Sequence, residues 1–381
     1  MKKSDLLKVS LPIKSISAKG QKVTITTEEP YPELKSELAS PFAAIYDTKA
    51  KSKVTDKPVG TGPYQIDNYK RAQKLELTKF KDYWQGKPKL NKVNVTYHED
   101  GNTRVDNLLS GKSDLTTDVP IDRISDVKNS KKANIQSTSG FRTHLLLYNH
   151  QSKKINKNVR EAFDMVINRK EIAKNISKNY AKPASTPFND RLKNVKNDKV
   201  QPQDIEKAKK LLAQEGFSKS HPLKINMVTY DGRPELPKIG QVIQSEAKKA
   251  NIDIQLRNVD DIDGYLKDPK AWDVSMYSYL TIPRGDTGYF FNTAYLPNGA
   301  LNKGHYNNKE VTQLIKKLNT SFGEKQRASV TNEILEKSKG DIPNSYITYN
   351  DQIDGVSSKV KNFNVTPESI YLIDYKVSKK E

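Results

Sequence analysis

Two basic side chains stand two positions apart at the start of an apolar run, in the stretch GFRTHLLLYN. Alternate residues of a β-strand face the same side, so Arg142 and His144 are expected to share one face. A guanidinium beside an imidazole can bind the carboxylate of an anionic ligand. Structural partners within the fold are the alternative, and the spacing leaves both interpretations open.

A second candidate region is the tyrosine-rich segment MYSYLTIPRGDTGYFFN, residues 276–292, which follows a predicted strand and contains a Pro-Arg-Gly-Asp turn. Loops that follow strands of α/β sheets commonly line binding clefts. Tyr277, Tyr279, Arg284 and Asp286 are therefore candidate ligand-binding residues. The alternative is a core aromatic cluster that ends in a surface turn.

The five histidines show neither an HExxH motif nor a close pair, so the sequence does not indicate a metal site made only of protein ligands. His305 lies in the polar stretch NKGHYNN, which is expected to be a loop and a candidate lid. It is the one histidine that we retain as a candidate metal ligand.

Catalytic motifs are missing from the sequence. The stretch GTGPY at residues 60–64 lacks the Lys and Ser or Thr of a phosphate loop, so a turn between strands is expected there. GxSxG and a Ser-His-Asp order do not occur, and the absence of cysteine excludes thiolates and disulfides. We predict no catalytic residues, no catalytic cofactor and no enzymatic activity.

The net charge of +20 raises the question of a nucleic-acid partner. The lysines are spread along all 381 residues, which favours a solvated basic surface, or contact with an anionic cell wall or membrane. We predict no nucleic-acid partner. No apolar stretch resembling a signal peptide follows MKKSDLL, and no run is long enough to span a membrane.

The pattern of predicted elements favours an α/β fold. HLLLYN reads as a buried central strand, and helices are predicted in NVREAFDMVINRKEIAKNI and QDIEKAKKLLAQEGF. Strands and helices then alternate over 221–345. We therefore predict one lobe from residues 1–220 plus 346–381 and a second from 221–345, a layout suited to closing around a ligand.

The stretch from GTGPY through DYWQGKPKL to NTRVDNLLSGKSDL, followed by NVREAFDMVINRKEIAKNI, AKPASTPF and IPNSYIT, resembles the bacterial family 5 extracellular solute-binding proteins. The resemblance covers nearly all of the chain. These proteins are the oligopeptide-, dipeptide- and nickel-binding components of ABC importers. The resemblance implies a two-lobed periplasmic-binding-protein-like fold (type II, cluster C) with a hinge and an interlobe cleft. It also implies a monomer that delivers its ligand to a membrane permease.

Family members normally begin with a signal peptide, a lipid-modified cysteine and further residues of the first lobe. By comparison the present chain looks truncated at its N-terminus, with an incomplete first lobe. The resemblance further implies a place on the outer face of the cell membrane, with a lipid anchor in the full-length form, and a Gram-positive source.

The resemblance also bears on the ligand. Peptide-binding members carry an Asp that holds the peptide amine, and Pro283 stands at the matching position here, as in nickel-binding members. Such members bind nickel as a chelate with small carboxylate or histidine-like molecules. A nickel chelate is therefore the expected ligand, and a di- or oligopeptide held by Asp286 is the alternative. The residues implied in chelate binding are Arg142, His144, Tyr279, Arg284 and His305.

Overall fold

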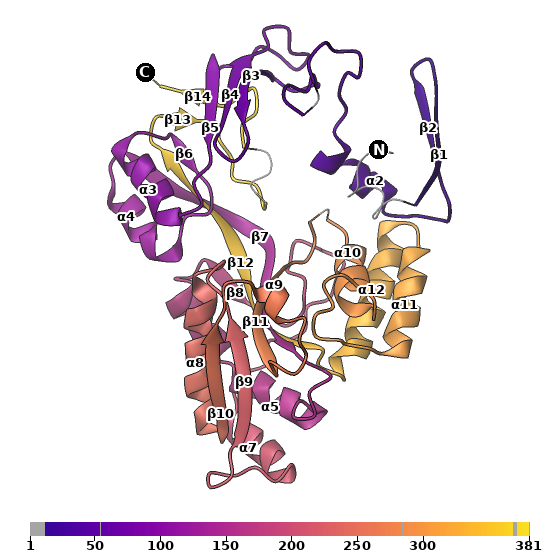
Figure 1. Cartoon of the computed structure of the whole chain (residues 1–381), viewed down its shortest axis with the longest axis vertical. Coiled ribbons are helices and arrows are strands. Elements are labelled where there is room, and N and C mark those ends of the chain that lie inside the picture. Colours follow the sequence, from indigo (N-terminus) through magenta and orange to yellow (C-terminus); the bar gives the residue numbers. More distant parts are fainter. Residues whose placement is uncertain (1–11, 54, 284, 369–371, 381) are drawn as a thin grey trace. The chain divides into compact units, whose positions relative to one another are not determined.

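The structure, a computed structural model, describes residues 12–53, 55–283, 285–368 and 372–380 (Figure 1). The chain divides into two compact units. Unit 1 contains the described residues up to Ala39 together with Phe141–Asn350, and unit 2 contains Ser40–Gly140 and the described residues from Asp351.

These units differ from the predicted lobes, whose boundaries lay at 220/221 and 345/346. The physical reason is the sheet of unit 1, in which strand β7 (Ala133–Tyr148) pairs with β11 (Val274–Leu280). This pairing joins residues before and after position 220 in one body. The long strands β7 and β12 (Asn344–Ser357) each pass from one unit into the other. The amino-acid composition of a strand does not show where it crosses from one unit to the next.

The sheet of unit 1 is mixed, with the strand order β10-β9-β11-β7-β12. Strands β9 and β10 run parallel, whereas β11 and β7 run antiparallel. The remaining strands of unit 1 are β10 (Ile252–Asn258), β9 (Leu223–Thr229), β8 (Ala181–Pro183), which pairs with β12, and the hairpin β1 (Ile13–Lys19) and β2 (Lys22–Thr27).

Helices cover both faces of this sheet (Figure 1). One face packs on α5 (Lys157–Val166), α7 (Ile205–Gln214) and α8 (Glu235–Lys249), and the other on η4 (Phe291–Tyr295), α11 (Lys309–Asn319) and α12 (Glu324–Lys339). The shorter helices are α2 (Leu34–Leu38), α6 (Arg169–Glu171), η3 (Ile172–Ile176), α9 (Ile262–Tyr265) and α10 (Gly288–Phe290).

The two covered faces explain the continuous apolar run in β7. Leu146 and Tyr148 belong to the core beside α5 and α8, whereas Leu145 and Leu147 belong to the core beside α11 and α12. A strand that is buried on both sides needs apolar side chains in both directions. The predicted buried central strand is therefore confirmed.

Unit 2 contains an antiparallel sheet in the order β3-β4-β5, formed by Tyr64–Lys70, Lys74–Lys79 and Lys92–Thr96. GTGPY ends where β3 begins, and no helix follows it, so the predicted turn is confirmed. The other elements are η1 (Pro41–Ala43), α3 (Gly101–Ser110), β6 (Leu115–Thr116), η2 (Ile121–Arg123), α4 (Ile124–Asn129), β13 (Val360–Lys361) and β14 (Ser378–Lys379).

The predicted helix in NTRVDNLLSG is also confirmed, as α3. The side chain of Asp100 accepts a hydrogen bond from the Thr103 amide at 2.7 Å and so caps the first turn. Gly111 ends the helix with φ = 81°, a left-handed conformation that favours glycine.

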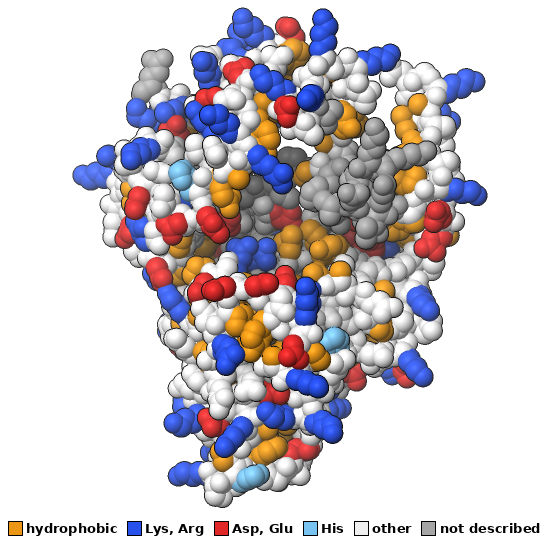
Figure 2. All heavy atoms as spheres, viewed as in Figure 1, with side chains coloured by type: hydrophobic (Ala, Val, Ile, Leu, Met, Phe, Trp, Pro, Cys, Tyr) orange, Lys and Arg blue, Asp and Glu red, His pale blue; other side chains and the backbone are white. Residues whose placement is uncertain are grey.

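Basic side chains are spread widely over the face drawn in Figure 2. Figure 2 shows Lys and Arg interleaved with Asp and Glu on the face in view, without one continuous basic patch. This distribution agrees with a solvated basic surface. No helix in the described part of the chain is both long enough and apolar enough to cross a bilayer.

Candidate functional site

The register of β7 against β11 fixes the surroundings of the first predicted pair. Arg142 stands opposite Leu280, and His144 stands opposite Ser278. Both basic side chains contact Ser278: His144 Nδ1 lies 2.9 Å from Ser278 Oγ, and Arg142 Nη1 lies 3.4 Å from the Ser278 carbonyl oxygen. The predicted shared face of Arg142 and His144 is confirmed, and Ser278 joins them.

His144 is fully buried beneath the first turn of α8, where its Nε2 lies 2.8 Å from Glu235 Oε1. Burial lowers the pKa of His144, although Glu235 opposes that shift. We assign a neutral imidazole whose Nε2–H donates to Glu235 and whose Nδ1 accepts from Ser278. Both ring nitrogens therefore have partners within the fold, and His144 is placed to hold Glu235 and Ser278 rather than a metal ion.

Burial alone would raise the pKa of Glu235, but the hydrogen bond from His144 leads the opposing contributions and lowers it from 4.5 to about 2. A depressed pKa gives stability that is present above pH 4.5 and is lost as the pH falls through about 2. Glu235→Gln should therefore lower the free energy of unfolding by roughly 1–3 kcal/mol at neutral pH. It should also flatten the acid dependence between these pH values, which denaturant titration at several pH values would measure.

Glu29→Gln is the matched control for that experiment, because Glu29 is exposed. It should leave both the neutral stability and the acid profile unchanged. An acid profile of Glu235→Gln identical to that of the wild type would contradict the assignment of an ionised Glu235 beside His144.

The sequence reasoning missed two residues next to this network, Tyr230 and Arg233, in the loop between β9 and α8. Tyr230 and both guanidinium-bearing residues, Arg142 and Arg233, are half-buried. Burial raises the pKa of Tyr230, the charges of Arg142 and Arg233 oppose that shift, and the charges of Asp263 and Glu235 add to it, so charges of both signs surround the phenol. Among the described residues, the Arg233 side chain has no hydrogen bond or ion pair, although its charge contributes to the lowered pKa of Glu235.

Each guanidinium presents several N–H donors to an anion, so Arg142 and Arg233 are candidate carboxylate-binding residues. The loop carries Arg233 at the carboxyl end of β9, where open α/β sheets bind their ligands. The signal that could have found it is TYDGRP, a turn directly after the predicted strand PLKINMVTY.

Tyr277 and Tyr279 lie on the opposite face of β11 from Ser278. Their rings are 4.9 Å apart, and Tyr279 stacks edge-on to Phe290 at 5.8 Å. The Tyr277 hydroxyl donates to Asp263 at 2.7 Å, and the Tyr279 hydroxyl donates to the Leu301 carbonyl. Both tyrosines therefore lie on the strand face away from Ser278, and their surroundings match the core aromatic cluster, although the Tyr277 ring also lies 6.0 Å from the ring of Tyr230.

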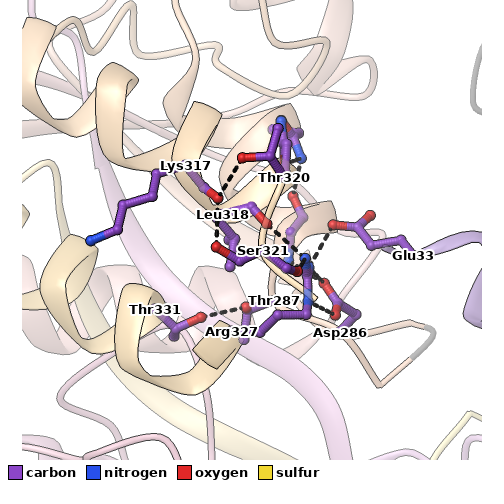
Figure 3. Close-up of polar contacts among 12 residues, drawn as sticks. Glu33, Asp286, Thr287, Lys317, Leu318, Thr320, Ser321, Arg327 and Thr331 are labelled. Atoms are coloured by element: carbon purple, nitrogen blue, oxygen red, sulfur yellow. Dashed lines mark hydrogen bonds and ion pairs between the residues drawn. The ribbon is translucent and has the colours of Figure 1, made fainter. Parts of the chain in front are cut away.

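Asp286 forms a two-point ion pair with Arg327 of α12 (Figure 3). Arg327 Nε lies 2.9 Å from Asp286 Oδ2, and Nη2 lies 2.6 Å from Oδ1. The same Oδ1 accepts the Gly288 amide at 2.7 Å. Both carboxylate oxygens are thus engaged within unit 1.

His305 is exposed, with φ = 59°, and follows Gly304, whose carbonyl oxygen accepts the His150 amide at 2.9 Å. That contact places His305 near the Tyr148 end of β7, roughly 20 Å along the strand from Arg142. The structure does not bring His305 together with the arginines.

Arg284 lies outside the described residues. Within the described ranges, no group of three or more His, Cys, Asp or Glu residues could hold a metal ion.

Ser278, His144 and Glu235 form a hydrogen-bonded series with the residue types of a hydrolase triad. Ser278 is only 7% exposed and lies within a strand instead of on a sharp turn, and its Oγ also lies 3.5 Å from Arg142 Nη1. A catalytic serine must reach a substrate carbonyl and have donors for the oxyanion. The arrangement therefore suits an internal support for Arg142 better than catalysis.

The comparisons with known proteins decide the family. Residues 4–302 match the family described as bacterial extracellular solute-binding proteins, family 5 Middle. The chain belongs to this family. The predicted family membership is confirmed, and the family consists of solute-binding proteins rather than enzymes.

Individual relatives agree with the family match. The chain is 60% identical over 378 residues to the nickel-binding protein NikA of Staphylococcus aureus, covering 99% of this chain and 77% of that protein. A crystal structure of Staphylococcus aureus NikA in complex with Ni(L-His)2 superposes with a TM-score of 0.84 at 60% identity, covering 100% of this chain and 82% of that one.

A structure described as a nickel ABC transporter from Bacillus halodurans also gives a TM-score of 0.84, at 32% identity, with 99% of this chain and 81% of that chain covered. The predicted two-lobed, periplasmic-binding-protein-like α/β fold is confirmed by these structures.

Proposed function

We propose that the chain is the solute-binding component of an ABC importer, which captures nickel as a small-molecule chelate and delivers it to a membrane permease. The observation that carries the proposal is the pair of half-buried guanidinium groups, Arg142 and Arg233, beside Tyr230. The 60% identity to a protein named for nickel binding, and the Ni(L-His)2 in the related crystal structure, support nickel–histidine as the chelate class.

In this account the chelator supplies the metal ligands and the protein binds the chelator. Imidazole and amine nitrogens are good nickel ligands, and a histidine complex also presents carboxylates. Arg142 and Arg233 would bind those carboxylates, while Tyr230 would offer its ring and hydroxyl. Such binding does not require a free ring nitrogen from His144, whose two nitrogens are held by Ser278 and Glu235.

The peptide alternative places a peptide amine on Asp286. That carboxylate already pairs with Arg327 through both oxygens, so a peptide amine would have to compete with a buried guanidinium. The engaged state of Asp286 therefore favours the nickel chelate.

The proposal extends to the setting of the protein. The chain would act outside the cytoplasm on the outer face of the cell membrane, with a lipid anchor in its full-length form, and would meet its permease there as a monomer. It would release its ligand chemically unchanged and would act without a catalytic cofactor, with nickel as its cargo.

The test is to incubate the protein with nickel, L-histidine and a mixed dipeptide library, remove free ligand by gel filtration, and analyse what stays bound. We expect nickel and histidine to be recovered together by metal analysis and mass spectrometry. Recovery of an intact dipeptide without nickel would contradict the proposal and favour peptide transport, and recovery of peptide fragments would indicate hydrolysis.

A further inference from the structure

One buried guanidinium in unit 1 faces two carboxylates from distant parts of the chain (Figure 3). Arg327 Nη2 lies 2.8 Å from Glu33 Oε1 and 2.6 Å from Asp286 Oδ1. Arg327 Nη1 donates to the Leu318 carbonyl at 2.8 Å, so both terminal nitrogens of the guanidinium have partners within the fold. Because Glu33 and Arg327 are 294 positions apart, their contact fastens the N-terminal segment to α12.

The carboxyl group of Glu33 occupies space that only a glycine leaves open. A Cβ atom on Gly288 would lie 1.7 Å from Glu33 Oε1 and 2.9 Å from Asp286 Oδ1. Gly288, Asp286 and Arg327 therefore form a socket, and the carboxyl group of Glu33, which is only 7% exposed, fills it. Glu29, another glutamate of the same segment, is exposed and does not fill this socket.

The socket holds one cation and two carboxyl groups, so ionisation of both carboxyl groups would leave an uncompensated buried negative charge. Such a charge is costly unless a proton neutralises it. Burial first and the Asp286 charge second raise the pKa of Glu33 from 4.5 to about 7, against the opposing effect of Arg327. Asp286, which precedes α10, and Arg327 from α12 are the described charged groups that face Glu33.

We propose that the Glu33 carboxyl group forms a proton-dependent latch, which holds the segment of residues 12–39 on the rest of unit 1 when Glu33 is protonated and loosens it when Glu33 is ionised. The inference does not depend on which solute the protein binds.

The direction of the pH effect follows from the raised pKa. The docked segment retains a proton that the released segment gives up between pH 4.5 and about 7. Docking is therefore strongest at acid pH and weakens as the pH rises through that interval. A shift of this size corresponds to an undocking equilibrium that changes by on the order of a hundredfold.

The latch can be tested with a single label, because the chain has no cysteine of its own. Lys35 is exposed in α2, so Lys35→Cys can carry a fluorophore whose anisotropy reports on the mobility of the segment. In an otherwise unchanged chain, anisotropy should fall between about pH 5 and about pH 8 with the loss of the Glu33 proton. Far-UV circular dichroism at both pH values would verify that unit 1 stays folded.

Glu33→Gln in the labelled chain should abolish the pH dependence, because glutamine keeps the shape of the carboxylic acid but cannot ionise. Glu29→Gln is the matched control and should keep the transition. The latch is overturned if Glu33→Gln retains the wild-type transition, or if the wild type shows none over this range.

Gly288→Ala tests the socket separately from the proton. The added methyl group should exclude the Glu33 carboxyl group and give low anisotropy at both pH values. Gly340→Ala is its control, because a Cβ there would meet only Lys337 O, at 3.9 Å. A pH transition in Gly288→Ala equal to that of the wild type would show that Glu33 does not dock in this socket.

Discussion

Replacing Arg327 with alanine should lower the free energy of unfolding by about 3–5 kcal/mol, the range for breaking a buried ion pair from one side. The variant leaves the Asp286 carboxylate without its cation, and beside Glu33 whenever that residue is docked. It also removes the donor to the Leu318 carbonyl, which ends buried without that partner. Urea titration at slightly alkaline pH measures the loss.

Lys337→Ala on the same helix is the control for Arg327→Ala. Lys337 pairs with Glu310 at the surface, where its side chain is 47% exposed, and exposed pairs contribute only about 0–1 kcal/mol. The loss in Arg327→Ala should also shrink at acid pH, because protonated carboxyl groups no longer need the cation. Equal losses in the two variants would contradict a buried, energetically important cluster.

Removing both arginines of the candidate site should have the largest effect on ligand binding. Arg142→Ala and Arg233→Ala should each weaken binding of nickel–histidine by about 1.5–3 kcal/mol, or roughly 10- to 100-fold, as expected for hydrogen bonds to a charged group. The double variant should bind too weakly to detect in the same experiment. Arg142→Lys should recover only part of the affinity, because an ammonium group cannot make the two parallel hydrogen bonds that a guanidinium makes to a carboxylate.

Arg257→Ala is the control for the arginine series. Arg257 lies on β10 of the same sheet and is exposed, and among the residues that the structure describes its side chain makes only a long contact of 3.4 Å to the Tyr265 hydroxyl. Its removal should leave both affinity and thermal stability unchanged. Wild-type affinity in the Arg142→Ala, Arg233→Ala double variant would remove both residues from the site.

Sequence patterns predicted those structural features that depend only on residues close together in the chain. The spacing of Arg142 and His144 predicted a shared strand face, and the apolar run after them predicted a central strand buried on both sides. Gly111 predicted the end of α3 from the left-handed conformation that a helix terminus requires.

The partners of these residues could not be predicted in the same way. Ser278 and Glu235 meet His144 from 134 and 91 positions away, and a single sequence does not encode that pairing in any local pattern. Alternation in β11 separates Ser278 from its two tyrosine neighbours. Which of the two faces meets Arg142 depends on the register of β11 against β7, and a shift of one residue would exchange the faces.

The turn that carries Asp286 shows the same limit. A Pro-Arg-Gly-Asp turn after a strand is a reasonable ligand-binding loop by composition. Its carboxylate is instead engaged by Arg327, which is 41 positions further along the chain, with Glu33 on the other side of the same guanidinium. Amino-acid composition does not reveal a buried arginine between two acidic residues, because only the fold brings Glu33, Asp286 and Arg327 together.

The most direct test of the proposed function is calorimetric titration of the metal-free protein with nickel alone, with L-histidine alone, and with the two combined. The carboxylate-binding arginines predict saturable binding of the combination, with little or no binding of either component by itself. Equal binding of nickel in the absence of histidine, or tight binding of a dipeptide in the absence of metal, would contradict capture of nickel as a chelate.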